Sequence, residues 1–191
     1  MSNAVSAATA PQGGGHSRLS TARPVIVLVA ICVVAGVLLG VVHQVTEPLA
    51  QANEARRAQE AYEKLMPSAA SFEAIPCDEE GCVAALRALD ASGSSVGTIV
   101  VAQSKGYGGQ VPIAVGFATD GTVTSILAMS NDETPGLGTR IAEEAYIGQY
   151  VGRDASQVDE SSIDLISGAT ISSKAALAAF NNAVEVYQEV K

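Results

Sequence analysis

Tryptophan is absent from this chain of 191 residues, and aromatic residues make up only 4% of it. A flat ligand would therefore be held mainly by backbone and aliphatic contacts. Basic residues are also scarce, because eleven Lys and Arg stand against twenty Asp and Glu, for a formal net charge of −9. That balance excludes a basic phosphate-binding face, so DNA and RNA are not expected partners. Three cysteines are too few for a disulfide-stapled scaffold or a zinc site of four thiolates.

One long apolar run lies near the amino terminus. Residues 24–42 carry no charged or strongly polar side chain, and a helix of that length spans about 28 Å, close to the hydrocarbon core of a membrane. Arg18 and Arg23 precede the run, whereas Glu47 and Glu54 follow it, which predicts a cytoplasmic amino terminus. A cleavable signal peptide is the alternative, but the run is longer than such a signal usually has.

These features predict four parts of the chain. We expect a cytoplasmic tail over residues 1–23, a transmembrane helix over 24–46, a linker helix over 47–67 and an extracytoplasmic domain over 68–191. The linker segment consists of strong helix formers and is ended by Pro67. The expected location is therefore the cell (inner) membrane, crossed once.

Short strand patterns dominate the chain after Pro67. Residues 96–102, 111–118 and 122–129 are rich in Val and Ile and are bounded by turn residues. Asp120-Gly121 separates the last two and is a strong hairpin signal, so we expect these two strands to pair antiparallel.

Two helices are expected after these strands. One covers about residues 139–151. The other is C-terminal, and its apolar side chains recur at spacings of three and four: Leu177, Phe180, Val184 and Tyr187. The predicted fold class is α+β, with a mainly antiparallel sheet and flanking helices.

The first candidate site segment reads Asp-Leu-Ile-Ser-Gly-Ala-Thr, from Asp164 to Thr170, and leads into the C-terminal helix. A tight turn before a helix amino terminus offers unpaired backbone amides and a partial positive charge, which together favour an anion. The alternative is structural: Thr170 or Ser172 is an ordinary N-cap, and Ser167-Gly168 is an ordinary turn. These residues alone leave both interpretations open.

Two further segments are rich in glycine. Residues 133–138 read Glu-Thr-Pro-Gly-Leu-Gly, in which the Pro-Gly pair favours a type II turn and a single leucine lies between two glycines. Such a loop suits contact with a flat ligand. Residues 106–109 read Gly-Tyr-Gly-Gly and supply a flexible loop with an aromatic ring. Taken singly, each is also compatible with a plain connecting loop.

Together, these segments resemble the FMN-binding domain of electron-transport flavoproteins. The Asp-x-x-Ser-Gly-Ala-Thr pattern is similar to the flavin-attachment signature of that family. The two glycine-rich segments, behind one N-terminal anchor, resemble the G subunit of the Rnf ion-translocating ferredoxin:NAD oxidoreductase. They also resemble the C subunit of the sodium-translocating NADH:quinone reductase. The resemblance covers roughly residues 20–190.

The resemblance implies a covalent cofactor. In this family a flavin transferase moves FMN from FAD onto the threonine hydroxyl of the signature as a phosphoester, and by position that threonine is Thr170. No catalytic or metal-ligating residue is implied. The implied cofactor-binding residues are Asp164, Ser167, Gly168, Ala169, Thr170, Glu133, Thr134, Pro135, Gly136, Leu137, Gly138 and Tyr107.

The implied function is that of an electron-carrying subunit rather than an independent enzyme. FMN on Thr170 would relay electrons between neighbouring subunits of an ion-translocating complex. The implied partners are the other membrane subunits, a flavin transferase during maturation, and membrane lipid. Two other functions stay open: a stand-alone membrane-anchored extracytoplasmic flavoprotein, and a tethered binding or scaffold domain without a redox cofactor.

The cysteines leave one question open. Cys77 and Cys82 would form a small disulfide loop outside the cytoplasm, whereas in a reducing environment they would be free thiols. Their spacing matches no common metal or redox motif. Cys32 lies in the apolar run, where we expect it to be a small apolar filler.

Overall fold

The structure, a computed structural model, describes residues 18–191. Most of the predicted tail, residues 1–17, lies outside the described residues. The chain divides into two units, with the boundary between Asn53 and Glu54.

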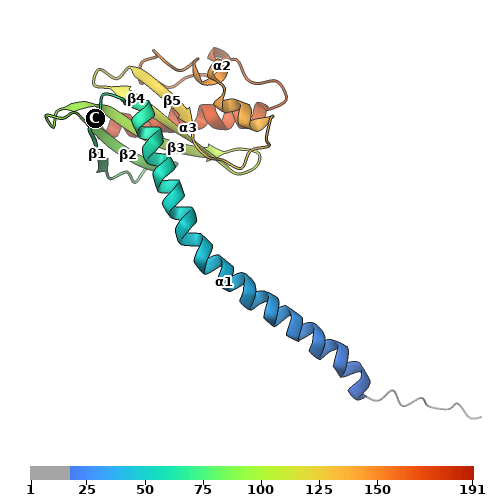
Figure 1. Cartoon of the computed structure of the whole chain (residues 1–191). Helices are drawn as coiled ribbons and strands as arrows, with labels where there is room; N and C mark the ends of the chain where they lie inside the picture. The colour runs from blue at the N-terminus through green and yellow to red at the C-terminus, as the bar shows by residue number, and fades with distance from the viewer. Residues whose placement is uncertain (1–17) are drawn as a thin grey trace, which may run out of the picture. The chain divides into compact units, whose positions relative to one another are not determined.

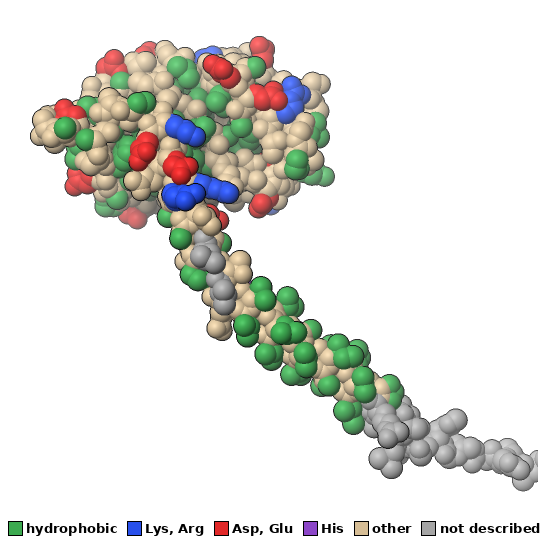
Figure 2. All heavy atoms as spheres, viewed as in Figure 1, with side chains coloured by type: hydrophobic (Ala, Val, Ile, Leu, Met, Phe, Trp, Pro, Cys, Tyr) green, Lys and Arg blue, Asp and Glu red, His purple; other side chains and the backbone are tan. Residues whose placement is uncertain are grey.

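The amino-terminal part is one long helix, α1 (Arg18–Leu65), in which both predicted helical segments are continuous. An 18-residue window within Pro24–Leu65 has a mean hydropathy of 3.3 and no buried residue, and among the described residues this is the one helix long and apolar enough to span a membrane. Figure 2 shows hydrophobic side chains along the visible face of this helix. Lipid would cover these side chains, because the helix itself leaves them exposed.

A single antiparallel sheet in the order β1-β2-β3-β4-β5 forms the centre of the second unit (Figure 1). The predicted strands are confirmed as β3, β4 and β5, and the predicted β4–β5 hairpin is confirmed with Gly121 at a φ of +91°. The strands are β1 (Ser71–Ile75), β2 (Cys82–Leu89), β3 (Ser95–Lys105), β4 (Gln110–Ala118) and β5 (Val123–Ala128).

Two strands were missed by the sequence prediction. β1 is short, and three of the eight residues of β2 are alanine, which is depleted in strands. Both form because β3 offers a long partner: β2 pairs with β3, and β1 then pairs with β2. A disulfide joins Cys77 to Cys82 at the beginning of β2, so the cysteine pair is oxidised in this structure.

The predicted helix over residues 139–151 is wrong. The segment consists of a 3-10 turn, η1 (Gly138–Ala142), and a short helix, α2 (Glu144–Ile147), separated by the extended residue Glu143. Its buried side chains Ile141 and Tyr146 are five residues apart, a spacing that one helix would not keep on a single face. A further 3-10 turn, η2 (Glu160–Ser162), follows.

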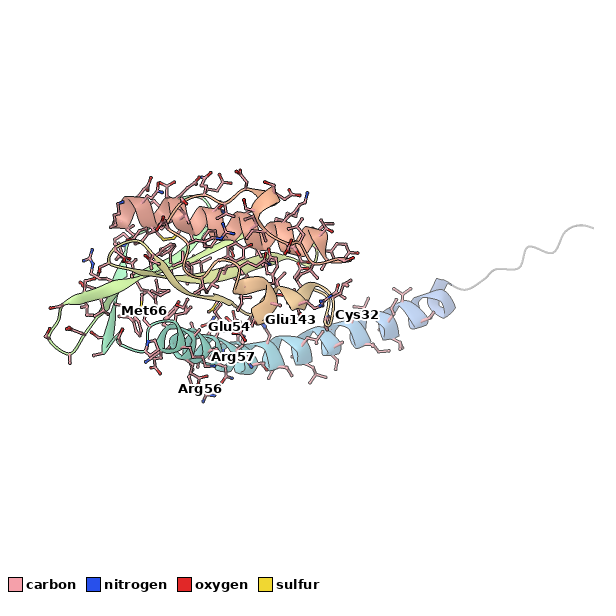
Figure 3. The ribbon with its side chains drawn as sticks, turned by 90° about the horizontal axis from the view of Figure 1, so that it is seen from above. Cys32, Glu54, Arg56, Arg57, Met66 and Glu143 are labelled. Carbon is pink, nitrogen blue, oxygen red and sulfur yellow. A yellow bond between two sulfur atoms is a disulfide. The ribbon has the colours of Figure 1, made fainter. Side chains whose placement is uncertain are left out.

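The predicted C-terminal helix is confirmed as α3 (Thr170–Val190), which covers one face of the sheet. Phe180 is fully buried there, and the Tyr187 ring stacks on Phe117 of β4 with centroids 4.3 Å apart. The last turns of α1 cover the opposite face, where Leu65 and Met66 pack against the sheet. Figure 3 shows these two helical layers on opposite sides of the strands, with Met66 labelled.

Close approach of α1 to the sheet depends on a glycine in β3. A Cβ atom at Gly97 would collide with Cε of Met66 and with the carbonyl oxygen of Phe117. The hydroxyl of Ser125 also donates a 2.7 Å hydrogen bond to the carbonyl oxygen of Leu65, one of the last carbonyls of α1. The end of α1 is therefore part of the core of the sheet domain.

We predict that Gly97→Ala lowers the free energy of unfolding by about 1–3 kcal/mol, because the added methyl overpacks a closed contact. Denaturant unfolding of the full chain in detergent measures this change. Gly109→Ala is the matched control, since its Cβ would meet Asp132 only at 3.7 Å. Equal stability of the two variants would contradict the packing described here.

Candidate functional site

Three segments that are far apart in the sequence line one cavity of about 540 Å³. They are the β3–β4 loop, the chain after β5, and the turn into α3. The volume lies within the roughly 300–1,000 Å³ typical of small-molecule sites. The lining residues are Tyr107, Glu133, Thr134, Leu137, Gly138, Gly168, Ala169, Thr170, Ile171 and Ser172.

The register of the sheet brings the first two segments together. Lys105 pairs with Gln110, so the β3–β4 loop lies at one end of the sheet. Ala128 pairs with Ile113 near the same end of β4, and the chain leaving β5 therefore emerges beside that loop. From the sequence only the order of these motifs along the chain is known, whereas the structure shows that they line one cavity.

Four sequence-predicted residues do not line this cavity. Pro135, Gly136 and Ser167 are exposed outside it, and the φ of +75° at Gly136 serves the turn before η1. Asp164 fixes the backbone just before the turn, because its amide donates a 2.7 Å hydrogen bond to Oε1 of Gln149. These residues shape the segments, whereas the cavity itself is lined by their neighbours.

Two lining residues were absent from the predicted set. Ile171 and Ser172 directly follow Thr170 in the first turn of α3. The Ile171 side chain is 56% exposed although it is large and apolar, while Ser172 is buried. Their position within one helical turn of the threonine is the sequence signal that identifies them.

A buried carboxylate connects the three segments. Glu133 is only 3% exposed, and its Oε1 accepts a 3.0 Å hydrogen bond from the amide of Gly108. Its Oε2 accepts a short hydrogen bond from the hydroxyl of Ser172 in the first turn of α3. One side chain therefore links the β3–β4 loop, the loop after β5 and the start of the helix.

The pKa of Glu133 follows from these contacts. Burial alone would raise the pKa, but hydrogen bonds from the Ser172 hydroxyl and from the amides of Gly108, Tyr107 and Gly109 hold it below its ordinary value. The carboxylate is consequently charged at neutral pH despite its burial.

Glycines on two sides make room for this carboxylate. A Cβ at Gly106 would collide with Oε1 of Glu133, and a Cβ at Gly138 would lie 2.6 Å from Oε2. Both glycines belong to the glycine-rich segments, of which residues 133–138 were expected to suit a flat ligand. In the structure these two glycines pack against a buried charge.

The amino terminus of α3 has no side-chain cap. Its N-cap residue is Ala169, without a capping hydrogen bond, and Thr170 is the first helical residue. The hydroxyls of Ser172 and Ser173 bond to Glu133 and to the Ala169 carbonyl oxygen, respectively. The alternative that Thr170 or Ser172 serves as an ordinary N-cap is therefore wrong.

The exposed hydroxyls of the cavity are few. Among the described lining residues with a hydroxyl, Thr134, Thr170 and Tyr107 are exposed, whereas Ser172 is buried and donates a hydrogen bond to a carboxylate. Of the two threonines, Thr170 is the one at the start of a helix of 21 residues. Its hydroxyl combines solvent access with unpaired amides and the positive end of a helix dipole.

Two buried tyrosines form a hydrogen-bonded pair that contacts the first turn of α3 from the core side. The hydroxyl of Tyr146 donates a 2.7 Å hydrogen bond to the carbonyl oxygen of Ser173, and so the Tyr150 hydroxyl, 2.9 Å away, donates to Tyr146. Burial raises the pKa of both phenols, which keeps them protonated as donors. No sequence pattern indicated this pair, since it lies in a segment predicted as one helix.

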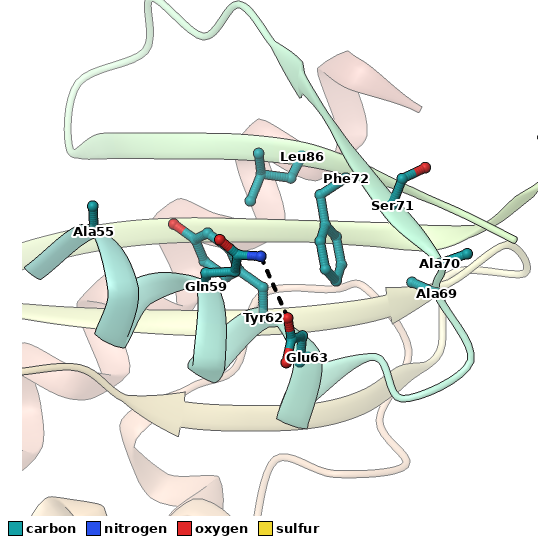
Figure 4. Close-up of a pocket in the computed structure, with 9 residues that line it drawn as sticks. All are labelled: Ala55, Gln59, Tyr62, Glu63, Ala69, Ala70, Ser71, Phe72 and Leu86. Atoms are coloured by element: carbon teal, nitrogen blue, oxygen red, sulfur yellow. Dashed lines mark hydrogen bonds between the residues drawn. The ribbon is translucent and has the colours of Figure 1, made fainter. Parts of the chain in front are cut away.

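Two further cavities lie on the sheet face that α1 covers. One, of about 570 Å³, lies between the last turns of α1 and the strands β1 and β2, where Tyr62 and Phe72 pack with ring centroids 6.0 Å apart (Figure 4). The other, of about 750 Å³, is lined from Glu54 to Asp132 by α1 and strand residues. Neither contains a residue of the predicted site.

The chain matches known proteins over most of its length. The FMN-binding domain family model matches residues 106–185, which include all three cavity segments. The G subunit of the ion-translocating oxidoreductase complex of Methanosarcina acetivorans is 33% identical, with 85% of this chain and 92% of that protein covered. The G subunit of the Na(+)-translocating ferredoxin:NAD(+) oxidoreductase complex of Acetobacterium woodii is 27% identical, with 86% and 90% covered.

Among solved structures, NqrC of Shewanella oneidensis is similar with a TM-score of 0.46 and 18% identity, covering 65% of this chain and 70% of that one. The relatives at the sequence level show the family. This chain belongs to the family of G subunits of ion-translocating oxidoreductase complexes, and it contains an FMN-binding domain.

We predict that Glu133→Gln lowers the free energy of unfolding at pH 7 by about 1–3 kcal/mol, because charge-assisted hydrogen bonds between the segments are weakened. The folded-state pKa is below the unfolded-state value, so this stabilisation is present above about pH 4.3 and is lost as the pH falls through the folded-state pKa. The difference between wild type and variant should therefore shrink on acidification.

Urea unfolding of the full chain in detergent between pH 7 and pH 3 measures both effects. The exposed neighbour Asp132 provides the control, since Asp132→Asn removes the same charge without touching the buried network. A stability difference that is independent of pH would contradict a charged Glu133 as its source.

Proposed function

We propose that this chain carries FMN as a phosphoester of Thr170. In this proposal it is the electron-carrying subunit of a membrane-bound, ion-translocating ferredoxin:NAD oxidoreductase complex of the Rnf type. The single observation that carries the proposal is the position of Thr170. This exposed residue lies at the uncapped start of α3, in the cavity where the three motif segments meet.

The described residues fit a phosphoester at this position. A monoanionic diester on the Thr170 oxygen would lie next to first-turn amides that have no side-chain cap. The helix dipole would stabilise that charge by about 0.3–1 kcal/mol. Exposed apolar surface for a flat ring is offered by Tyr107, Leu137 and Ile171, which line the same cavity.

The attachment step requires a flavin transferase and FAD. The oxygen of the Thr170 hydroxyl forms a bond to the phosphorus on the FMN side of FAD, the P–O bond of the pyrophosphate breaks, AMP leaves, and the hydroxyl proton is released. Neither oxidation nor reduction occurs. Ser172 and Ser173 are buried and hydrogen-bonded, so they do not compete as acceptors.

A covalent link suits the composition of the cavity. Among the described lining residues there is no Lys, Arg or His, and a free FMN phosphate would meet the negative charge of Glu133 without a cationic partner. Tethering replaces this weak binding by an intramolecular contact at roughly millimolar effective concentration. When bound, FMN supplies reversible electron transfer, and the chain positions it.

We further propose the topology that the sequence indicated. The amino terminus, residues 1–23, is cytoplasmic, residues 24–46 cross the membrane, and 47–67 lead to an extracytoplasmic flavin domain over 68–191. The Cys77–Cys82 disulfide supports an oxidising compartment for that domain. The partners in this proposal are the other membrane subunits, lipid, and the transferase during maturation.

Replacement of the acceptor hydroxyl tests the cofactor link. In cells with a competent flavin transferase, Thr170→Ala should abolish flavin fluorescence of the denatured band on a gel, while Thr170→Ser retains it in part because a hydroxyl remains. Thr134→Ala is the matched control, since it removes the other exposed threonine hydroxyl of the cavity and should keep full fluorescence. Persistent fluorescence of Thr170→Ala would refute this acceptor.

The oxidation state of the two cysteines in intact cells tests the proposed membrane topology. In intact cells, the Cys77–Cys82 pair should resist a maleimide reagent until a reductant is added, after which both thiols react. A C-terminal alkaline phosphatase fusion should be active, because that enzyme matures only outside the cytoplasm. An inactive fusion together with free thiols would place the domain in the cytoplasm and contradict the proposed orientation.

Purification from native membranes separates the alternatives. The proposal predicts that the flavin-bearing chain co-purifies with other membrane subunits. A flavinylated chain without partners would indicate a stand-alone flavoprotein instead. A chain without attached flavin, despite an active transferase in the cell, would indicate a tethered binding domain.

A further inference from the structure

The wall of the cavity contains a negatively charged side chain that is held in a fixed position. The carboxylate of Glu133 is held through both oxygens, by the Gly108 amide at 3.0 Å and by the Ser172 hydroxyl. Gly106 and Gly138 pack so closely against it that neither position has room for a methyl group. The carboxylate is thus fixed in place in the wall of the cavity that Thr170 also lines.

No cationic side chain neutralises this carboxylate among the described residues. The ion pairs of the sheet domain outside α1 join Lys174 to Glu160 at 2.8 Å and Arg140 to Glu143 at 3.3 Å, and neither involves Glu133. The positive potential at the α3 amino terminus could offset the charge of Glu133. In the proposed function, however, the negative phosphoester is bound at that terminus.

A fixed negative charge in a buried site opposes the addition of further negative charge. The effective dielectric constant at a buried group is far below that of water, so a carboxylate acts more strongly there than on the surface. Uptake of two electrons and one proton by a bound flavin would add one net negative charge to the cavity. The carboxylate therefore raises the free energy of the reduced state relative to the oxidised state.

We propose that Glu133 sets the redox poise of this site, its buried carboxylate lowering the reduction potential of FMN held at Thr170. This inference rests on the proposed function and adds a role for one residue within it. Glu133 also orders the loops, but the electrostatic role makes a prediction that a purely structural role does not.

The test is a redox titration of the flavinylated full chain in detergent. Glu133→Gln preserves the shape of the side chain and removes its charge. The reduction potential of FMN in this variant should become more positive. The expected change is on the order of tenfold in the equilibrium constant between oxidised and reduced flavin, which corresponds to about 30 mV for a two-electron couple.

Asp132→Asn is the matched control, because it removes one charge at the adjacent, exposed residue outside the cavity lining. Its potential should stay close to that of wild type. An unchanged potential in Glu133→Gln, or an equal shift in both variants, would overturn the proposal.

Ser172→Ala distinguishes charge from loop order and provides a second test if Glu133→Gln does not fold. It removes the hydrogen bond that the Ser172 hydroxyl donates to Oε2 of Glu133 but leaves the carboxylate, now with one donor fewer. The potential of Ser172→Ala should be unchanged or lower. A positive shift in this variant would show that the hydrogen bond sets the potential, and would overturn the role of the charge.

These outcomes are separate from those of the proposed function. In-gel fluorescence of the same preparations reports covalent flavin before any potential is measured. A dark wild-type band refutes the proposed function and this inference with it. A fluorescent wild-type band with identical potentials for wild type and Glu133→Gln refutes the inference alone.

Discussion

The site depends on the contacts of one buried carboxylate. Glu133 accepts hydrogen bonds from the β3–β4 loop and from the first turn of α3, and it lies itself in the loop after β5. A buried charge without partners would be costly, so the loss of these donors would destabilise the domain. The glycines at 106 and 138 are part of the same constraint, because any larger residue would displace the carboxylate.

The availability of Thr170 follows from this arrangement. Because Ser172 donates to Glu133 and Ser173 donates to the backbone, neither caps the helix, and the first-turn amides of α3 stay available. Tyr146 holds the same turn from the core side through the Ser173 carbonyl. The helix start is thus fixed by interactions that do not involve the side chain of Thr170, and its free amides favour an anion at this position.

Much of this architecture could be predicted from the sequence, and the failures have physical causes. Val- and Ile-rich runs and the Asp-Gly turn indicated β3, β4 and β5, whereas the alanine-rich β2 forms only because β3 is there to pair with it. The three site segments were identified from their sequence motifs and from the order of these motifs along the chain. Their meeting at one cavity depends on strand register, and the burial of Glu133 depends on glycines from two different loops. A carboxylate beside a Pro-Gly turn gives no local sign of burial.

Covalent FMN on Thr170 is the feature from which the proposed electron transfer follows, and mass spectrometry of the protein from its own membranes can detect it. We predict an intact mass increased by that of FMN less one water. We also predict that the peptide containing residues 164–172 carries the entire increase at Thr170. An unmodified Thr170 in that peptide, with the transferase present in the same cells, would contradict this assignment.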